Sequence, residues 1–347
     1  MVRIGGHEIG AGRRCFVIAE AGVNHNGDLD LALELVGAAA DAGADAVKFQ
    51  TFRAEAVASP SAAKAGYQLE STPAEESQLE MLRGLELGWD EHVQLLRRAQ
   101  ERGVLFLSSA FDLESVSLLK RLGVAALKVA SAEVTNLPLL RGVAAAGLPV
   151  ILSTGTADLE EVAVAVEALT DAGAVSIVLL HCVSAYPAPA ADANLRAMAT
   201  MAGRFGLPVG YSDHTEGDEV ALAAVALGAC VLEKHFTLDR SLPGPDQRAS
   251  LEPAELERLV RGVRRVESAL GDGLKRPTPL ETENARAVRR SLAAADDLPA
   301  GARLTAGMLT ALRPGTGISP TRIDEVVGRR LRRELGQGEL LDPGDLE

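Results

Sequence analysis

The stretch LPVGYSDHTEGDEVALAAVALGACVLEKHFTLDRSLPGPDQRAS, residues 207–250, decides how the rest of the chain is interpreted. It contains two strand-like apolar runs, residues 207–211 and 230–234, joined by a helical run rich in Ala, Val and Leu. A histidine follows each run, His214 after the first and His235 after the second. Parallel strands present their carboxyl ends at one rim, so we expect both imidazoles to face one site. The loops around them hold more titratable groups than a structural segment requires, namely Asp213, Lys234, Asp239, Asp246 and Arg248.

The same alternation of strand and helix extends outward through most of the chain. The apolar runs are rich in Val, Ile and Leu, which is typical of parallel strands buried on both faces. Eight strands that are each followed by a helix predict a (β/α)₈ barrel. The alternative, a doubly wound open sheet, lacks a G-x-G-x-x-G motif after the first strand. The expected strands span residues 16–20, 46–49, 104–107, 126–129, 150–152, 176–180, 207–211 and 230–234, and the expected helices span 28–42, 90–102, 114–122, 137–146, 159–172, 195–205, 219–227 and 253–270.

The segments outside this alternation have different compositions. Residues 1–14 are predicted to form a small hairpin that caps one end of the barrel. Residues 51–77 show no clear periodicity, and a loop of that length in a compact domain is usually functional. The predicted organisation is a barrel domain over residues 1–272, a linker over 273–286 and a small domain over 287–347. The small domain contains an internal sequence repeat, which we call the echo and which predicts a pseudo-symmetric β fold. Five residues recur at one constant offset: Leu298, Gly301, Leu304, Gly307 and Leu309 recur as Leu335, Gly338, Leu341, Gly344 and Leu346.

The composition narrows the class of protein. The chain has 347 residues, of which 47% are hydrophobic, which is enough for a sizeable core. Its net charge of −13 argues against a nucleic-acid partner or an anionic membrane surface. No apolar run is long enough to span a membrane, and the amino terminus lacks the apolar region of a signal peptide. Cys15, Cys182 and Cys230 are interpreted as reduced thiols, so we expect a cytoplasmic protein.

Polar residues occupy the carboxyl end of every expected strand. Two of the lysines, Lys48 and Lys128, together with several hydroxyls favour a small, dense anion such as a phosphate or a phosphocarboxylate. The two histidines with nearby carboxylates favour a divalent metal, and Glu20 and Glu133 offer general acid or base chemistry. Structural roles stay open, since Glu20 can serve as a buried partner of a lysine and Cys182 as an inert thiol. The rim residues are Glu20, Lys48, Ser108, Ser109, Lys128, Ser131, Glu133, Ser153, Thr154, His181, Ser184, Tyr186, Ser212, Asp213, His214, Glu233, Lys234 and His235.

These residues lie in motifs that resemble one family across nearly the whole chain. The motifs are FVIAEAGVNHNGD, GADAVKFQTFRAE, ESQLEML, LKVASAEVTNLPLL, LSTG, LLHC with YPAP, GYSDHTEG, EKHFTLDRSLPGPD, RRSL and LRPG. As a set they resemble the sialic acid synthase (N-acetylneuraminate synthase) family. The resemblance implies an α/β fold, a (β/α)₈ TIM barrel followed by a small β-rich antifreeze-like (SAF, β-clip) domain. It also implies a domain-swapped homodimer.

The resemblance implies a role for each matching residue. Phosphoenolpyruvate would be bound by Lys48, Ser109, Lys128, Ser131, Ser153, Ser184 and Ser212. His214 and His235 would hold a divalent metal, with Mn²⁺ expected and Mg²⁺ or Co²⁺ as alternatives. The sugar would be positioned by Glu20, Tyr186 and Asp246, and by Arg313 reaching from the partner subunit. Catalytic roles fall to Glu20, Glu133 and His235, with Glu133 handling a proton during attack by water.

The implied reaction joins phosphoenolpyruvate, an N-acetylmannosamine-type sugar and water into a nonulosonic (sialic) acid and phosphate. Ser184 and Gln247 depart from the residues usual in the family, which are Asn and His, and both departures lie on the sugar side. The alternative acceptor is therefore 2,4-diacetamido-2,4,6-trideoxymannose, which makes a legionaminic acid synthase. Other classes considered are a ketodeoxy-sugar phosphate synthase, which would want more rim cations, and a non-catalytic carbohydrate- or ice-binding protein, which leaves the rim residues without a role.

Overall fold

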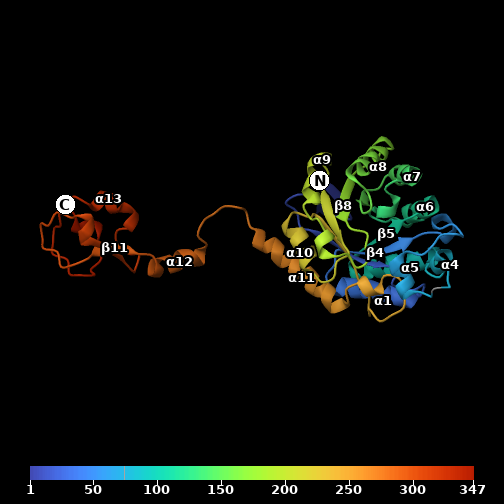
Figure 1. Ribbon diagram of the computed structural model, residues 1–347, viewed down its shortest axis with the longest axis horizontal. Coiled ribbons are helices and arrows are strands. Elements are labelled where there is room, and N and C mark those ends of the chain that lie inside the picture. The colour runs from blue at the N-terminus through green and yellow to red at the C-terminus, as the bar shows by residue number, and fades with distance from the viewer. Residues whose placement is uncertain (74) are drawn as a thin grey trace. The chain divides into compact units, whose positions relative to one another are not determined.

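The computed structural model describes residues 1–73 and 75–347 (Figure 1). The chain forms two compact units, Met1–Gly271 and Asp272–Glu347. The boundary lies one residue before the expected end of the barrel domain. Among the described residues, no helix is long and apolar enough to cross a membrane.

The first unit is a closed barrel of eight parallel strands, as the alternation of strands and helices predicted. The barrel closes where β10 pairs with β3, with His235 opposite Glu20 in the register. Figure 1 shows the helices arranged around these strands. The strands in order are β3 (Phe16–Gly22), β4 (Ala46–Thr51), β5 (Leu105–Ala110), β6 (Leu127–Val129), β7 (Val150–Ser153), β8 (Ile177–Cys182), β9 (Val209–Asp213) and β10 (Val231–His235).

Several of the helices that cover the barrel begin at side-chain caps. Asp28 accepts hydrogen bonds from the backbone N–H groups of Asp30 and Leu31, and Asp158 forms a capping box with Glu161. These caps satisfy backbone donors that the first turn of a helix leaves unpaired. The covering helices are α1 (Leu29–Asp41), α5 (Trp89–Arg102), α6 (Leu113–Leu122), α7 (Leu137–Ala145), α8 (Leu159–Asp171), α9 (Ala197–Phe205), α10 (Glu219–Ala226) and α11 (Pro253–Leu270).

Each strand divides its side chains between two cores. On β3, Val17 and Ala19 pack in the layer between strands and helices, whereas Phe16 and Ile18 fill the barrel interior, as the period of two requires. The interior is sealed at the amino end by the expected hairpin, β1 (Val2–Ile4) and β2 (His7–Ile9), whose isoleucines are fully buried in the interior core. The inward face of each strand therefore runs from an apolar floor to a polar rim.

Short helices occupy the segment for which the sequence showed no periodicity. They are α2 (Ala54–Val57), α3 (Gly66–Ser71) and α4 (Gln78–Arg83). The last of them begins at a capping box between Ser77 and Glu80. Met81 and Leu85 are buried with Val23 and Phe52 in a separate apolar cluster. We call residues 51–88, which carry these helices, the β4–α5 excursion.

The second unit has its own small core. Strands β11 (Ser291–Ala294) and β12 (Leu309–Leu312) pair antiparallel, and the short helix α13 (Ile323–Val326) follows. The two halves of the echo meet, since Leu298 and Leu335 form a β-bridge and both side chains lie in the core. The segment expected as a linker, residues 273–286, ends inside helix α12 (Pro279–Val288), which starts at a capping box between Thr278 and Glu281.

Candidate active site

A cavity of about 360 Å³ opens at the carboxyl ends of the barrel strands. The residues that line it come from the uppermost inward positions of the strands and from the loops that follow them. Polar side chains there follow directly above the apolar floor, so the barrel positions them on a rigid frame. The cavity brings together these predicted site residues: Glu20, Lys48, Ser109, Lys128, Ser131, Ser153, Ser184, Tyr186, Ser212, His214, His235 and Asp246.

Two buried lysines share two buried carboxylates at the base of the cavity. Lys48 Nζ lies 2.7 Å from Glu20 Oε2 and 3.7 Å from Glu233 Oε1, and it donates to Ser109 Oγ at 2.9 Å. Lys128 Nζ lies 3.6 Å from Glu233 Oε1. Buried charges persist only when they are paired in this way, so the group is poised to exchange carboxylate contacts for an anionic ligand.

The protonation of this group follows from burial and from its neighbours. Burial lowers the pKa of Lys128 despite the nearby Glu233. Burial also favours a lower pKa for Lys48, but the negative charges of Glu20 and Glu233 outweigh burial, so the pKa of Lys48 is raised. Burial raises the pKa of Glu20 to about 7, whereas Lys128 and Lys48 overcome burial and lower the pKa of Glu233. Glu20 can therefore gain or lose a proton near neutral pH, as general acid–base chemistry requires.

Serine hydroxyls and one glycine form a cradle beside the lysines. The Gly155 N–H donates to Ser131 Oγ at 2.9 Å, and the Ser153 hydroxyl is buried with no hydrogen-bond partner among the described residues. A Cβ at Gly155 would lie 2.3 Å from Ser184 Oγ and 3.0 Å from Ser131 Oγ. A larger residue at this position would push these side chains aside, and the unpaired Ser153 hydroxyl suits an oxygen atom of an anion.

His214 and His235 face each other with their ring centroids 5.4 Å apart. His214 donates from Nδ1 to the Val183 carbonyl at 2.7 Å, which leaves its Nε2 as the basic nitrogen. His235 Nδ1 is buried without a hydrogen bond within the described chain, and it lies 3.9 Å from Asp246 Oδ2. Burial lowers the pKa of both histidines. Neutral imidazoles with available nitrogens fit a divalent metal.

These histidines would supply part of a coordination shell. Within the described residues, no group of three or more His, Cys, Asp or Glu side chains is arranged to hold a metal ion. A metal held by two imidazoles keeps other positions open for oxygen ligands from water or substrate.

The residues expected to contact the sugar adjoin the lysines and the histidines, with Glu20 beside Lys48, Asp246 beside His235 and Tyr186 against His214. Burial raises the pKa of Asp246 to about 6. Gln50, which the sequence analysis did not select, donates from Nε2 to Glu20 Oε1 at 3.4 Å. Gln247 does not point into the cavity, because its side chain donates to the Asn24 carbonyl and accepts from the Thr237 hydroxyl. This departure from the family pattern therefore joins two loops behind the site.

Glu133 is not brought to this cavity. Ser131 and Glu133 lie in a single 3-10 turn, Ser131–Glu133, and residues two apart in a turn of three face different directions. Ser131 lines the cavity, whereas the Glu133 carboxylate accepts from Asn136 Nδ2 at 2.6 Å. Arg313 belongs to the second unit, so the barrel unit does not supply it.

Alternation along the strands also removes other rim residues from the cavity. Lys234 and Asp213 form an ion pair at 2.7 Å, and neither lines the cavity among the described residues. His181 Nε2 bonds to the Ala193 carbonyl at 2.9 Å. Glu233, in contrast, is central to the site, although the sequence analysis gave it no role. Its position two residues before His235, on the same face of β10, was the signal that could have identified it.

Two family models match the chain, one over most of the barrel unit and the other within the second unit. Residues 35–275 match the NeuB family model and residues 289–347 match the SAF domain model. The N,N'-diacetyllegionaminic acid synthase of Legionella pneumophila is 49% identical over 336 residues, covering 96% of this chain and 94% of that protein. The enzyme of the same name from Campylobacter jejuni is 48% identical, covering 95% of this chain and 99% of that protein.

A solved structure shows a similar fold. The crystal structure of N-acetylneuraminic acid (sialic acid) synthetase from Leptospira borgpetersenii, in complex with citrate, superposes with a TM-score of 0.72. It is 40% identical and covers 82% of this chain and 94% of that chain.

Proposed function

This chain belongs to the NeuB family, and we propose that it condenses phosphoenolpyruvate with 2,4-diacetamido-2,4,6-trideoxymannose and water to give a legionaminic acid and phosphate. The observation that carries the proposal is the pair of buried lysines and the pair of histidines facing one cavity. N-acetylmannosamine, our first expectation from the sequence, is less well supported as the acceptor. Relatives that are 49% and 48% identical are named for legionaminic acid synthesis, whereas the solved sialic acid synthetase is 40% identical.

In this proposal Lys48 and Lys128 bind the anionic groups of phosphoenolpyruvate. The serine cradle beside Gly155 supplies further donors. Carbon 3 of phosphoenolpyruvate attacks the sugar aldehyde and forms the new carbon–carbon bond. Water then adds to carbon 2, and the carbon–oxygen bond to phosphate breaks. The lysines stabilise the charge that grows on the departing phosphate, so they bind the transition state more tightly than the substrate.

His214 and His235 would hold the divalent metal, Mn²⁺ in our proposal with Mg²⁺ or Co²⁺ as alternatives. Such an ion supplies Lewis-acid polarisation of the sugar aldehyde. Glu20 is the stronger candidate for moving a proton at the attacking water, because it lines the cavity and its pKa is raised to about 7. Glu133, our sequence-based choice, lies outside the cavity lining.

We further propose that the enzyme acts as a domain-swapped homodimer in the cytoplasm. Arg313 would then reach the sugar from the partner subunit, which is the role that the family resemblance implies. The three cysteines are free and buried, which is consistent with a reducing compartment.

The test is release of inorganic phosphate from phosphoenolpyruvate across a panel of amino sugars with added Mn²⁺. We expect the diacetamido sugar to give the highest kcat/KM. Release with N-acetylmannosamine alone would restore the first expectation, and no release with any sugar would reject the condensation. Lys128→Ala serves as the inactive control.

A further inference from the structure

The cavity has a charged part and a neutral part. The charged part holds the lysines, the histidines and the carboxylates described above. The neutral part is lined by an apolar wall, Val23, Met81, Leu82, Leu85 and Phe111. These five side chains also pack against one another in a single cluster. The same cluster contains Phe52, which packs against Phe111 at 6.0 Å between ring centroids, so the wall is backed by a small apolar core of its own.

The wall comes from three segments that are distant in the sequence. Val23 follows β3, Phe111 follows β5, and the other three residues belong to helix α4 and the turn after it. Glutamine side chains border it, with Gln50 on β4 and Gln78 at the start of α4. This part of the cavity therefore offers apolar contact and neutral amides rather than charge.

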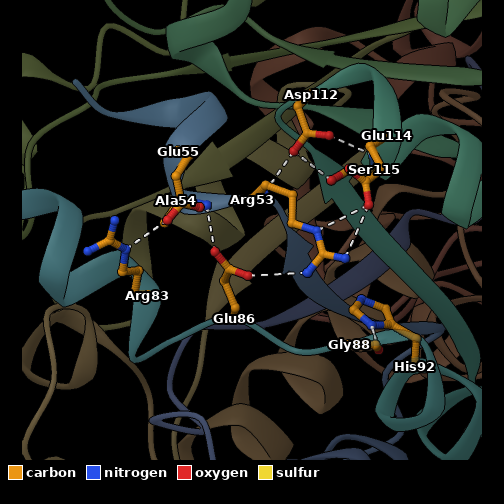
Figure 2. A network of polar contacts seen from close by, with 10 residues as sticks. All are labelled: Arg53, Ala54, Glu55, Arg83, Glu86, Gly88, His92, Asp112, Glu114 and Ser115. Carbon is orange, nitrogen blue, oxygen red and sulfur yellow. Dashed lines mark hydrogen bonds and ion pairs between the residues drawn. The ribbon is translucent and has the colours of Figure 1, made fainter. Parts of the chain in front are cut away.

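A network around Arg53 holds the β4–α5 excursion in place (Figure 2). Arg53 Nη1 donates to Glu86 Oε2 at 3.3 Å, and its Nη2 donates to Glu114 Oε1 at 3.1 Å. Its backbone N–H donates to Asp112 Oδ2 at 2.9 Å, and the Ala54 N–H donates to Glu86 Oε1 at 2.6 Å. The network joins the end of β4 to the turn after α4 and to the start of α6, so the segments that carry the wall are tied together.

The lysines that line the cavity already form ion pairs with buried glutamates. Among the described lining residues, Lys48 and Lys128 are the lysines and there is no arginine. Both lie within 3.7 Å of a buried glutamate, and the proposed reaction requires both for phosphoenolpyruvate. A second phosphate, carried on the acceptor, would meet the apolar wall without a counter-charge in a protein of net charge −13.

We propose that the apolar wall receives carbon 6 of the acceptor as a methyl group and is the determinant that selects a 6-deoxy sugar over a 6-hydroxy or 6-phosphorylated one. This inference rests on the proposed function. A hydroxyl that enters an apolar surface loses its hydrogen bonds to water without replacement. Because a hydrophobic pocket rejects an added hydroxyl only moderately, we expect a preference of about 10- to 100-fold in kcat/KM.

The experiment compares two sugars that differ only at carbon 6. These are 2-acetamido-2,6-dideoxymannose and 2-acetamido-2-deoxymannose, and phosphate release from phosphoenolpyruvate reports turnover of each. The wild-type enzyme should prefer the 6-deoxy sugar by about 10-fold or more, and the 6-phosphate of the second sugar should give no measurable turnover. Equal kcat/KM for the first two sugars, or turnover of the phosphate, would overturn the inference.

The variant that tests the wall is Leu82→Gln, since this side chain is only partly buried and the substitution keeps its size. It should reduce the 6-deoxy preference about 10-fold and leave the KM for phosphoenolpyruvate unchanged. The matched control is Leu69→Gln in the same excursion, where the leucine is 50% exposed and does not line the cavity. It should keep the wild-type preference.

Folding and function are separated by two further measurements. Leu82→Met keeps the wall apolar and should keep the preference, and thermal unfolding of each variant checks the fold. If Leu82→Gln is unstable, the comparison rests on Leu82→Ala, which shortens the wall and should also reduce the preference. If the wild-type enzyme turns over the diacetamido sugar but Leu82→Gln and Leu82→Ala keep the 6-deoxy preference, the role of the wall is rejected and the proposed function stands. Absence of turnover with every sugar rejects the proposed function instead.

Discussion

Glu233 Oε1 lies 3.6 Å from Lys128 Nζ, and both side chains are buried at the base of the cavity. Burial lowers the pKa of Lys128, and Glu233 is the group that most strongly opposes this effect. The positive charge available to a phosphate at this position therefore depends on a carboxylate that the sequence analysis left without a role.

Glu233→Gln should weaken phosphoenolpyruvate binding in a pH-dependent manner. Without the carboxylate, the pKa of Lys128 falls further, so the lysine loses its proton as the pH rises. We expect the KM for phosphoenolpyruvate to rise about 10- to 100-fold, as for a lost hydrogen bond to a charged group, and to rise more at pH 8 than at pH 6. Steady-state kinetics across this range test it, with Glu167→Gln on the exposed face of α8 as the control. Parallel pH profiles for wild type and variant would contradict the prediction.

Glu20 should make the stability of the barrel depend on pH. Burial raises its pKa in the folded chain from 4.5 to about 7. Between these values the folded chain binds more protons than the unfolded chain, so the unfolding free energy falls as the pH rises, by at most about 3 kcal/mol. Glu20→Gln should flatten this dependence. Urea unfolding followed by the fluorescence of Trp89, the single tryptophan, reports the barrel unit. Curves of equal slope in both proteins would exclude Glu20 as the cause.

His214→Ala and His235→Ala should each lower metal-dependent turnover by on the order of 10³-fold, because each would remove one imidazole ligand of the proposed metal. Mn²⁺ binding followed by electron paramagnetic resonance gives a readout that is independent of turnover. His7→Ala, in the hairpin at the opposite end of the barrel, is the control and should retain both properties. Normal Mn²⁺ affinity in the two site variants would place the metal elsewhere.

Arg313 should act across a dimer. Arg313→Ala and Lys128→Ala are each expected to be nearly inactive alone. Mixed and reassembled at equal concentrations, they should recover about a quarter of wild-type activity, because half of the dimers are mixed and each has one intact site. Failure of the mixture to gain activity would indicate a site completed within one chain.

The barrel was predictable because each of its strands is a short apolar run between helical segments, and burial on both faces enforces that pattern. The cavity was predictable only in part. The sequence placed Glu233, Lys234 and His235 at the same rim, whereas the alternation of β10 turns Lys234 to the outer face, where it pairs with Asp213. The sequence analysis treated the rim as a set of strand ends and did not assign each residue to a face of its strand. For this reason it counted Lys234 among the residues near the site and gave Glu233 no role.

The apolar wall was less accessible to sequence reasoning. Helix α4 has six residues, which is too short for a helical period to stand out. Leu82 and Leu85 lie in an excursion whose two ends are joined through Arg53 and Glu86 and which is tied to α6 through Glu114. Such tertiary contacts override local preference and are not visible in the spacing of residues.

Below the cavity, the barrel is closed by its own apolar interior and by the amino-terminal hairpin that packs against it. With Ile4 and Ile9 plugging the base, every molecule must enter and leave past the carboxyl rim. Under the proposed function, phosphoenolpyruvate has to bind to the lysines at the base of the cavity before the sugar binds. The bound sugar then blocks its release. The order of entry, and the retention of phosphate until the new acid departs, would thus follow from an access route that the packed barrel interior closes on one side.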